Sequence, residues 1–271
     1  MDRRLTPANG RVASLSLAGE VAAEKYLAGW RMTVAVPVVD LCDAPLGARD
    51  RQLLLGASVT VYEDHNGWCF VQAADDGYVG YVPTAALMAE TPPTHHVASL
   101  ATHAYATPDF KSANLSHLPF GARVTVTGER RKFFETNVGF IPKSHLRGLD
   151  RPMADPVTVA QLHFGTPYLW GGNSSLGIDC SGLVTVGLRA CGVACPGDSD
   201  LQRAGLGTAF DGDYRRGDLV FWKGHVGIMV DTETLIHANA HHMAVVYEPI
   251  EKAILRISAQ GDGDVIAKRR L

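Results

Sequence analysis

Short apolar runs with turn-forming residues between them dominate residues 33–91. The runs are rich in β-branched and aromatic residues, and Asp64-His65-Asn66-Gly67 and Asp75-Asp76-Gly77 are typical turn sequences. This spacing predicts several short strands that close into a small β-barrel. The expected strands are Thr33–Val39, Ser58–Tyr62, Trp68–Ala73 and Val79–Val82. Pro92-Pro93 comes next and favours a linker.

Residues 94–149 repeat this order of features. Gly56-Ala57-Ser58-Val59-Thr60-Val61 is echoed by Gly121-Ala122-Arg123-Val124-Thr125-Val126, and Gly80-Tyr81-Val82-Pro83 by Gly139-Phe140-Ile141-Pro142. The repetition indicates an internal duplication of a barrel of about 55 residues. Strands are expected at Ala104–Thr107, Gly121–Gly128, Phe133–Thr136 and Val138–Pro142.

Residues 150–271 follow a different pattern. Apolar residues of Ser181–Gly192 recur at helical spacing, and Pro156–Phe164 is a second expected helix. Strands are expected after them at Leu219–Trp222, Val226–Val230, Thr234–His237 and Ala244–Tyr247. Helices followed by antiparallel strands predict an α+β domain. Residues 1–32 contain a weakly amphipathic stretch and are expected to form an N-terminal helical segment.

Composition narrows the functional classes. Hydrophobic residues make up 46% of the 271 positions and charged residues 20%, which is enough apolar side chain to build cores and excludes general disorder. The net charge of -3 argues against a nucleic-acid binder. No apolar run approaches the roughly 18 residues that a bilayer requires, so no membrane partner is expected.

Cysteine usage and the N-terminal sequence indicate the compartment. The five cysteines are odd in number, and Arg3 and Arg4 are not followed by the apolar stretch of a secretory signal. We therefore expect a cytoplasmic protein with free thiols. Cys191 and Cys195 lack a second pair of zinc ligands, so neither a metal nor a cofactor is expected.

Cys180 is the candidate nucleophile. It lies where a glycine-rich loop turns into the Ser181–Gly192 helix, and the free N–H groups of a helix start favour a thiolate and can hold an oxyanion. His225 begins one expected strand and His237 ends the next, twelve positions later. A hairpin of these strands brings the two imidazoles together at one end of the sheet. The set predicts a nucleophile, its base and a residue that orients the base.

Five motifs occur in order along this region. They are Tyr168-Leu169-Trp170-Gly171-Gly172, Asp179-Cys180-Ser181-Gly182, Gly217-Asp218-Leu219-Val220-Phe221, Gly224-His225-Val226-Gly227-Ile228 and Ile236-His237-Ala238. With them the chain closely resembles the NlpC-type family of cell-wall cysteine peptidases, which have a papain-like fold with rearranged chain order. The resemblance implies that Cys180 is the nucleophile, His225 the base and His237 the third, polar member. The repeated region resembles bacterial SH3-like barrels.

The resemblance implies four parts and a substrate. The parts are residues 1–32, a first SH3-like barrel at 33–91, a second at 94–149 and the catalytic domain at 150–271. Members with such barrels resemble dipeptidyl-peptidase VI-like enzymes, which cut the γ-D-glutamyl to diamino acid bond of free murein peptides. They require an N-terminal L-alanine and release L-Ala-γ-D-Glu for peptidoglycan recycling. A monomer acting on such a peptide is expected.

An ammonium group in a partly dry cleft needs acceptors and a counter-charge. Asp179 is one candidate, with Tyr168 and Ser181 as polar neighbours. Related sequences place an acid and a tyrosine in the first barrel, where this chain has Asp43 and Tyr78. Asp43 is also a plausible turn residue before Pro45, and relatives usually have Glu at its position and Arg at that of Cys42.

Two other functions remain open from the sequence. An amidase or acyltransferase of the same fold uses the same Cys-His pair. A non-catalytic peptidoglycan-binding protein is the second alternative, against which the joint presence of Cys180, His225 and His237 argues.

Overall fold

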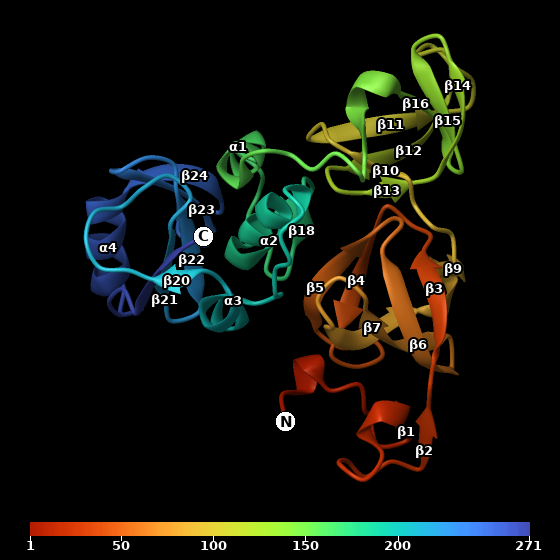
Figure 1. Ribbon diagram of the computed structural model, residues 1–271, viewed down its shortest axis with the longest axis horizontal. Helices are drawn as coiled ribbons and strands as arrows, with labels where there is room; N and C mark the ends of the chain where they lie inside the picture. Colours follow the sequence, from red (N-terminus) through yellow and green to blue (C-terminus); the bar gives the residue numbers. More distant parts are fainter. The chain divides into compact units, whose positions relative to one another are not determined.

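Alternating apolar residues place the strands of residues 30–89 around a buried core. In the computed structural model, which describes residues 1–271, these strands form a seven-stranded sheet in the order β5-β4-β8-β7-β6-β3-β9 (Figure 1). The elements are β3 (Trp30–Val34), β4 (Val38–Cys42), β5 (Arg49–Leu54), β6 (Ser58–His65), β7 (Trp68–Ala73), β8 (Val79–Pro83), the 3-10 turn η3 (Thr84–Ala86) and β9 (Leu87–Ala89). We call this part the first β-subdomain; Leu41, Val59 and Val71 are among its fully buried residues.

Residues 95–148, the second β-subdomain, repeat this strand order. One sheet runs β12-β11-β16-β15-β14 and corresponds to β5-β4-β8-β7-β6 of the first β-subdomain. A second sheet runs β13-β10-β17 and corresponds to β6-β3-β9. The long strand β6 thus has two counterparts, β13 and β14. The elements are β10 (His95–Val97), β11 (Ala101–Tyr105), β12 (Asn114–Pro119), β13 (Arg123–Val124), β14 (Val126–Arg130), β15 (Phe133–Thr136), β16 (Gly139–Pro142), η4 (Lys143–His145) and β17 (Leu146–Gly148). The repeat seen in the sequence is therefore also a repeat of topology.

The two β-subdomains belong to one unit, Met1–Asp150. The backbone N–H of Arg123 donates to the carbonyl of Leu55, and the Arg123 guanidinium pairs with Asp75 at 2.9 Å. Gly56 has a φ of +78°, and a Cβ at this position would collide with the backbone of Arg123. A glycine in the first subdomain thus permits the close approach of the second.

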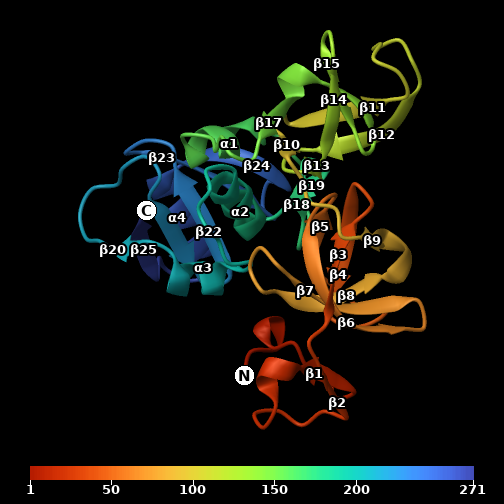
Figure 2. The same cartoon turned by 45° about the vertical axis from the view of Figure 1, so that its right-hand side comes forward.

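Residues 1–29 are not helical, so the expected N-terminal helical segment is wrong. They hold two short 3-10 turns and a parallel strand pair (Figure 2), namely η1 (Arg3–Leu5), β1 (Val12–Ser14), η2 (Leu15–Leu17) and β2 (Lys25–Leu27). Gly10, Gly19 and Gly29 all have positive φ values, which interrupt any helix there. The apolar positions instead serve tertiary packing, since Val12 joins a cluster with Tyr62 and other residues of the first β-subdomain.

The second unit, Arg151–Leu271, is built on a six-stranded sheet in the order β20-β25-β21-β22-β23-β24. Neighbouring strands pair antiparallel throughout. Its main strands are β20 (Thr208–Ala209), β21 (Leu219–Trp222), β22 (His225–Met229), β23 (Thr234–Asn239), β24 (Ala244–Pro249) and β25 (Ala267–Arg270), and a small pair is formed by β18 (Asn173–Ser174) and β19 (Gly177–Ile178). Its helices are α1 (Pro156–Leu162), α2 (Cys180–Ala190), α3 (Ser199–Gly205) and α4 (Ile250–Ala259).

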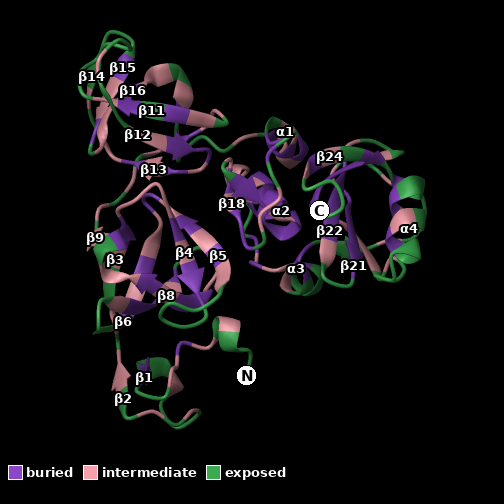
Figure 3. Cartoon of the chain, turned by 180° about the vertical axis from the view of Figure 1, so that it is seen from behind, coloured by how far each residue is buried: buried purple, intermediate pink, exposed green.

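The two faces of this sheet carry different helices. Phe221 and Ile228 lie in a core cluster with Leu183 of α2, whereas Val220 and Met229, at alternate positions, join the cluster that contains α4. Burial follows this layering, because α2 is largely enclosed and α4 exposes its outer side (Figure 3). No helix of the chain is long and apolar enough to cross a membrane.

Candidate active site

Cys180 is the first residue of α2, and Asp179 caps that helix. The Asp179 carboxylate accepts hydrogen bonds from the backbone N–H groups of Gly182 at 2.6 Å and Gly171 at 2.9 Å, and from the Ser181 hydroxyl at 2.9 Å. The bond from Gly182 satisfies one of the free N–H groups of the helix start. The carboxylate also fixes the loop that precedes α2, so the thiol stands on a rigid element.

The histidines meet as the hairpin argument predicts. His225 begins β22, and its Nε2 lies 2.9 Å from Nδ1 of His237 on β23. The register pairs Ile228 with Ile236, which places His237 opposite Gly227. A Cβ on Gly227 would approach Cβ of His237 at 3.4 Å and collide with the side chain of Leu235. Glycine at this position leaves the face open for the two imidazoles.

Two further residues extend this chain of polar groups, and the sequence analysis missed both. The Glu248 carboxylate on β24 lies 3.1 Å from Nε2 of His237. Arg256 of α4 donates to both oxygens of Glu248, with Nε at 2.9 Å and Nη2 at 2.7 Å. Spacing along the sequence offers no signal for this pair, because a strand and a helix contribute one residue each.

These contacts set the protonation of the two imidazoles. Since a carboxylate only accepts, the Nε2 of His237 carries the proton that Glu248 receives, and its Nδ1 is an acceptor. His225 must then donate from Nε2, which leaves its Nδ1 as the basic atom. The amide nitrogen of Asn239 also lies 3.0 Å from Nε2 of His237, and its oxygen accepts from the backbone N–H of His242.

The thiol lies between α2 and the turn that joins β21 to β22. Its sulfur is 4.0 Å from the carbonyl oxygen of Gly224. Burial raises the pKa of the Cys180 thiol to about 12, and the charge of Asp179 adds to this effect. The N–H groups of Val226 and Ser181 oppose it without reversing it. Burial and the capping acid thus oppose the thiolate that the helix N-terminus favours.

The pKa of His225, the candidate base, shifts in the opposite direction. Burial, followed by the neighbouring His237 and Arg256, lowers the pKa of His225 to about 3, although Glu248 acts in the opposite direction. Burial also lowers the pKa of His237, while Glu248 raises it. At neutral pH the thiol at the start of α2 and the imidazole at the start of β22 are therefore both neutral. Such a pair can exchange its proton as the sulfur attacks.

Tyr168 and Ser181 lie close to this centre. Burial, followed by the nearby Cys180 and Asp179, raises the pKa of the Tyr168 hydroxyl, so it stays a neutral donor. Ser181 is buried, and its carbonyl oxygen accepts from the side chain of Gln202 at 2.9 Å. Roles for both residues in substrate binding stay predictions.

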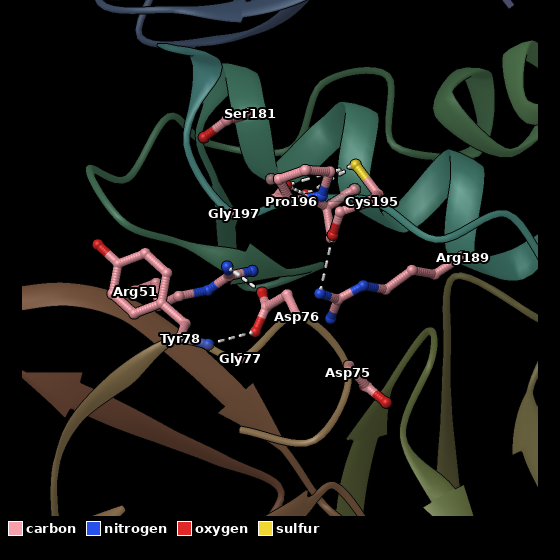
Figure 4. A network of polar contacts seen from close by, with 12 residues as sticks. Arg51, Asp75, Asp76, Gly77, Tyr78, Ser181, Arg189, Cys195, Pro196 and Gly197 are labelled. Atoms are coloured by element: carbon pink, nitrogen blue, oxygen red, sulfur yellow. Dashed lines mark hydrogen bonds and ion pairs between the residues drawn. The ribbon is translucent and has the colours of Figure 1, made fainter. Parts of the chain in front are cut away.

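Asp43 and Tyr78 belong to the first β-subdomain. Asp43 is exposed in the turn between β4 and β5. Tyr78 is only 1% exposed, and the Arg51 guanidinium lies 5.2 Å from its ring centre (Figure 4). Arg51 also pairs with Asp76, whose carboxylate accepts from the backbone N–H of Tyr78. This network fixes the Tyr78 turn; contact of either residue with a substrate stays a prediction.

The site residues do not resemble a metal centre. No group of three or more His, Cys, Asp or Glu side chains in the chain is placed to hold a metal ion, and all five cysteines are free. Beside His225, however, a pocket of about 550 Å³ opens between the β21–β22 turn and the C-terminal part of α4.

Comparisons with known proteins give matches in both units of the chain. Residues 165–258 match the model of the NlpC/P60 family, and residues 41–87 match that of the bacterial dipeptidyl-peptidase Sh3 domain. The chain is 30% identical to the γ-D-glutamyl-L-lysine dipeptidyl-peptidase of Bacillus subtilis over 69% of this chain and 71% of the relative. It is 26% identical to the protein of the same name from Bacillus cereus over 74% and 70%.

A solved structure has the same fold. The crystal structure of an NlpC/P60 family protein from Bacillus cereus aligns with a TM-score of 0.76 at 20% identity and covers 89% of this chain and 99% of that one. The match to the Bacillus subtilis relative takes in more than two thirds of each chain. The chain therefore belongs to the NlpC/P60 family.

Proposed function

We propose that this protein is a cysteine peptidase that cuts the γ-D-glutamyl to diamino acid bond of free murein stem peptides. In this proposal it releases L-Ala-γ-D-Glu from peptides whose N-terminal L-alanine is free. The observation that carries it is the buried Cys180 thiol, 4.0 Å from the carbonyl of Gly224 next to His225, with the hydrogen-bonded chain from His225 through His237 to Glu248. The relatives of the chain are named dipeptidyl-peptidases. A buried thiol beside a base oriented by a second residue is the arrangement that acyl transfer needs.

The first step is attack of the Cys180 sulfur on the γ-carbonyl carbon of D-glutamate. His225 takes the thiol proton at Nδ1 as the carbon–sulfur bond forms, and its Nε2–H remains bonded to His237. The N–H groups of the α2 start and of Val226 face the sulfur and are the candidates to hold the oxyanion.

The second half of the cycle reverses the proton transfer. His225 returns its proton to the nitrogen of the departing diamino acid, and a thioester of L-Ala-γ-D-Glu remains on Cys180. Water then attacks the thioester with His225 as base, which frees the dipeptide and restores the thiol. A helix-borne thiol against a histidine-bearing antiparallel sheet also supports the papain-like arrangement expected from the sequence.

The free N-terminus of the peptide needs an acceptor and a counter-charge. Asp179, Tyr168 and Ser181 beside the nucleophile, and Asp43 and Tyr78 in the first β-subdomain, are our candidates. The match of residues 41–87 to a dipeptidyl-peptidase Sh3 domain supports the last two, since both fall inside it. A requirement for a free amine suits recycling of peptides already detached from the glycan, and we propose a cytoplasmic monomer for this role.

A substrate comparison tests the proposal. We expect cleavage of L-Ala-γ-D-Glu-diamino acid tripeptides and a loss of at least 100-fold in kcat/KM when the alanine amine is acetylated, because the ammonium loses its charge. Product analysis by mass spectrometry separates peptidase from amidase or acyltransferase chemistry. Equal cleavage of free and acetylated peptides contradicts the free-amine requirement. Absence of any cleavage leaves a binding protein as the better description.

A further inference from the structure

The second β-subdomain places two histidines opposite each other on its surface. His103 of β11 and His117 of β12 are direct partners in the antiparallel register, and their ring centres are 5.2 Å apart at an interplanar angle of 63°. His103 is exposed and His117 is half-buried, whereas the next pair along the ladder, Thr102 and Leu118, points into the core. The proposed function uses neither histidine.

Both imidazoles are available to a ligand from outside the chain. Neither His103 nor His117 takes part in a hydrogen bond or an ion pair. Their only contacts of this kind are between rings, with each other and, for His103, with Tyr105 at 6.2 Å. A neutral imidazole carries one unprotonated ring nitrogen, so the pair offers two nitrogen ligands on one face of the sheet.

The internal repeat gives an independent measure of this position. The strands β4 and β5 correspond to β11 and β12, and a register shift follows at the same distance in both pairs. Asp40 and Gln52 therefore stand where the second β-subdomain has His103 and His117. The Gln52 amide donates a hydrogen bond to the Asp40 carboxylate at 2.9 Å. The backbone at this position thus brings the polar atoms of opposite side chains into direct contact.

Side chains that approach this closely can share one metal ion. Two nitrogens that each lie about 2.0–2.1 Å from one ion are about 3 Å apart, which is the spacing that the equivalent pair reaches. Imidazole suits Ni²⁺, Cu²⁺ and Zn²⁺, whereas Mg²⁺ and Ca²⁺ take oxygen ligands. No group of three or more His, Cys, Asp or Glu is placed to hold an ion, so two ligands from the protein leave the other positions to water.

We propose that His103 and His117 form a two-histidine site for a divalent transition-metal ion of the Ni²⁺, Cu²⁺ and Zn²⁺ class. One ring nitrogen of each residue binds the ion, and water fills the remaining positions. The site lies within the second β-subdomain and does not depend on the proposed function, whose catalytic residues belong to the second unit. The cysteines gave no reason to expect a metal, and the fourteen positions between the two histidines conceal the pair until the strands are aligned.

A nickel titration of the tag-free protein tests the site. Ni²⁺ is preferred to Cu²⁺ as the probe, because Cu²⁺ can oxidise the five free cysteines. In isothermal titration calorimetry at about pH 7.5, where imidazole is mostly neutral, we expect one Ni²⁺ ion to bind at this site and Mg²⁺ not to bind there. Paramagnetic Ni²⁺ should also broaden the amide NMR signals of β11 and β12, which locates the ion in the chain.

Variants show whether the two histidines act together. His103→Ala and His117→Ala should each weaken this binding at least tenfold, since loss of even an outer partner of a metal ligand costs about 10–100-fold. The double variant should bind no more weakly than either single variant, because one imidazole alone cannot chelate the ion. His65→Ala removes an exposed histidine of the first β-subdomain and is the matched control, which should keep the wild-type affinity.

The outcomes that overturn the proposal are distinct. Wild-type affinity in either single variant removes that histidine from the site. Broadening that leaves β11 and β12 unaffected places the ion elsewhere. Losses that add up in the double variant indicate two independent histidines instead of a shared ion. Acidification to about pH 5 should release the ion, because a ligating imidazole must be neutral, and binding that is unchanged at that pH also contradicts the proposal.

Discussion

The substitution Glu248→Gln tests how the charge of Glu248 acts on His225 through the hydrogen-bonded His237. The substitution keeps the shape of the side chain and removes its charge. When His225 accepts the thiol proton, the Glu248 carboxylate is the nearest negative group in the relay, reached through His237. The charge stabilises the imidazolium, and its loss should therefore raise the barrier to attack.

The size of this effect follows from the geometry. The two imidazole ring centres are 5.1 Å apart, and Glu248 lies 3.1 Å beyond Nε2 of His237. A separation of about 8 Å with an effective dielectric constant of about 20 gives roughly 2 kcal/mol, or about 30-fold in rate. We expect kcat to fall by this factor while KM changes less than about threefold, because His237 shields Glu248 from the substrate.

Steady-state kinetics on the tripeptide measures the effect, and thermal unfolding shows whether the variant is folded at the assay temperature. Glu251→Gln, at an exposed position in the first turn of α4, is the matched control and should behave as the wild type. Glu248→Gln leaves the Arg256 charge unpaired near His225, so adding Arg256→Gln should recover part of both kcat and Tm. A folded Glu248→Gln protein with more than a third of wild-type kcat refutes the reasoning.

Three further predictions concern the nucleophile, the sheet and acid stability. Because burial raises the pKa of Cys180 to about 12, iodoacetamide should label this cysteine slowly at pH 6–8 and faster as the pH rises. Mass spectrometry follows the labelling, and a labelling rate that is already fast and constant below pH 7 contradicts a neutral thiol. Gly227→Ala should lower kcat at least tenfold and stability by about 1–3 kcal/mol, because its Cβ collides with Leu235 and displaces His237; wild-type kcat and Tm contradict this. The pKa of Glu248 is held below its usual value because hydrogen bonds from His237 and Arg256 outweigh burial. The charged Glu248 therefore stabilises the folded protein above about pH 4.3, and this contribution is lost as the pH falls through the lower pKa of the folded state. In denaturant unfolding, the free energy of unfolding should fall less steeply with acid in Glu248→Gln than in the wild type. Parallel curves of unfolding free energy against pH contradict this prediction.

Strands with regular alternation were predictable in detail. Trp68–Ala73, Phe133–Thr136 and Leu219–Trp222 have the same bounds in the structure as in the prediction. The expected strand Thr33–Val39 is instead two, β3 and β4, with Pro37 in the gap between them. A proline cannot donate to a ladder, so a break there has a local cause that the apolar run concealed.

Charged elements escaped the sequence analysis. The strand β25 ends in Lys268-Arg269-Arg270 yet lies inside the sheet between β20 and β21. Its Arg270 is held by the buried Asp218 at 2.6 Å, so a partner about 50 positions away makes this strand possible. Hydrophobic periodicity carries no trace of such a pairing.

The candidate site also contains residues that the sequence predicted and residues that it did not. Cys180, His225 and His237 were identifiable because each occupies a defined place in a local motif, and the hairpin brings the histidines together. Glu248 and Arg256 follow no motif, and their role depends on how α4 packs against β24. The groups that touch the reacting atoms were therefore accessible from the sequence, whereas the groups that hold them in place were not.

The two-residue turn Lys223-Gly224 restricts the length of the connection between β21 and β22 more than it restricts the side chain at position 223. Gly224 has a φ of +72°, and Trp222 pairs directly with His225 across the turn. Turn type and length help to fix the register of a hairpin, so an inserted residue would disturb the pairing that places His225 at the start of β22. The side chain of Lys223 is exposed and bears on no such geometry. A lineage, or a directed-evolution library, can therefore vary the residue at this position while the strand pairing that places His225 is inherited unaltered.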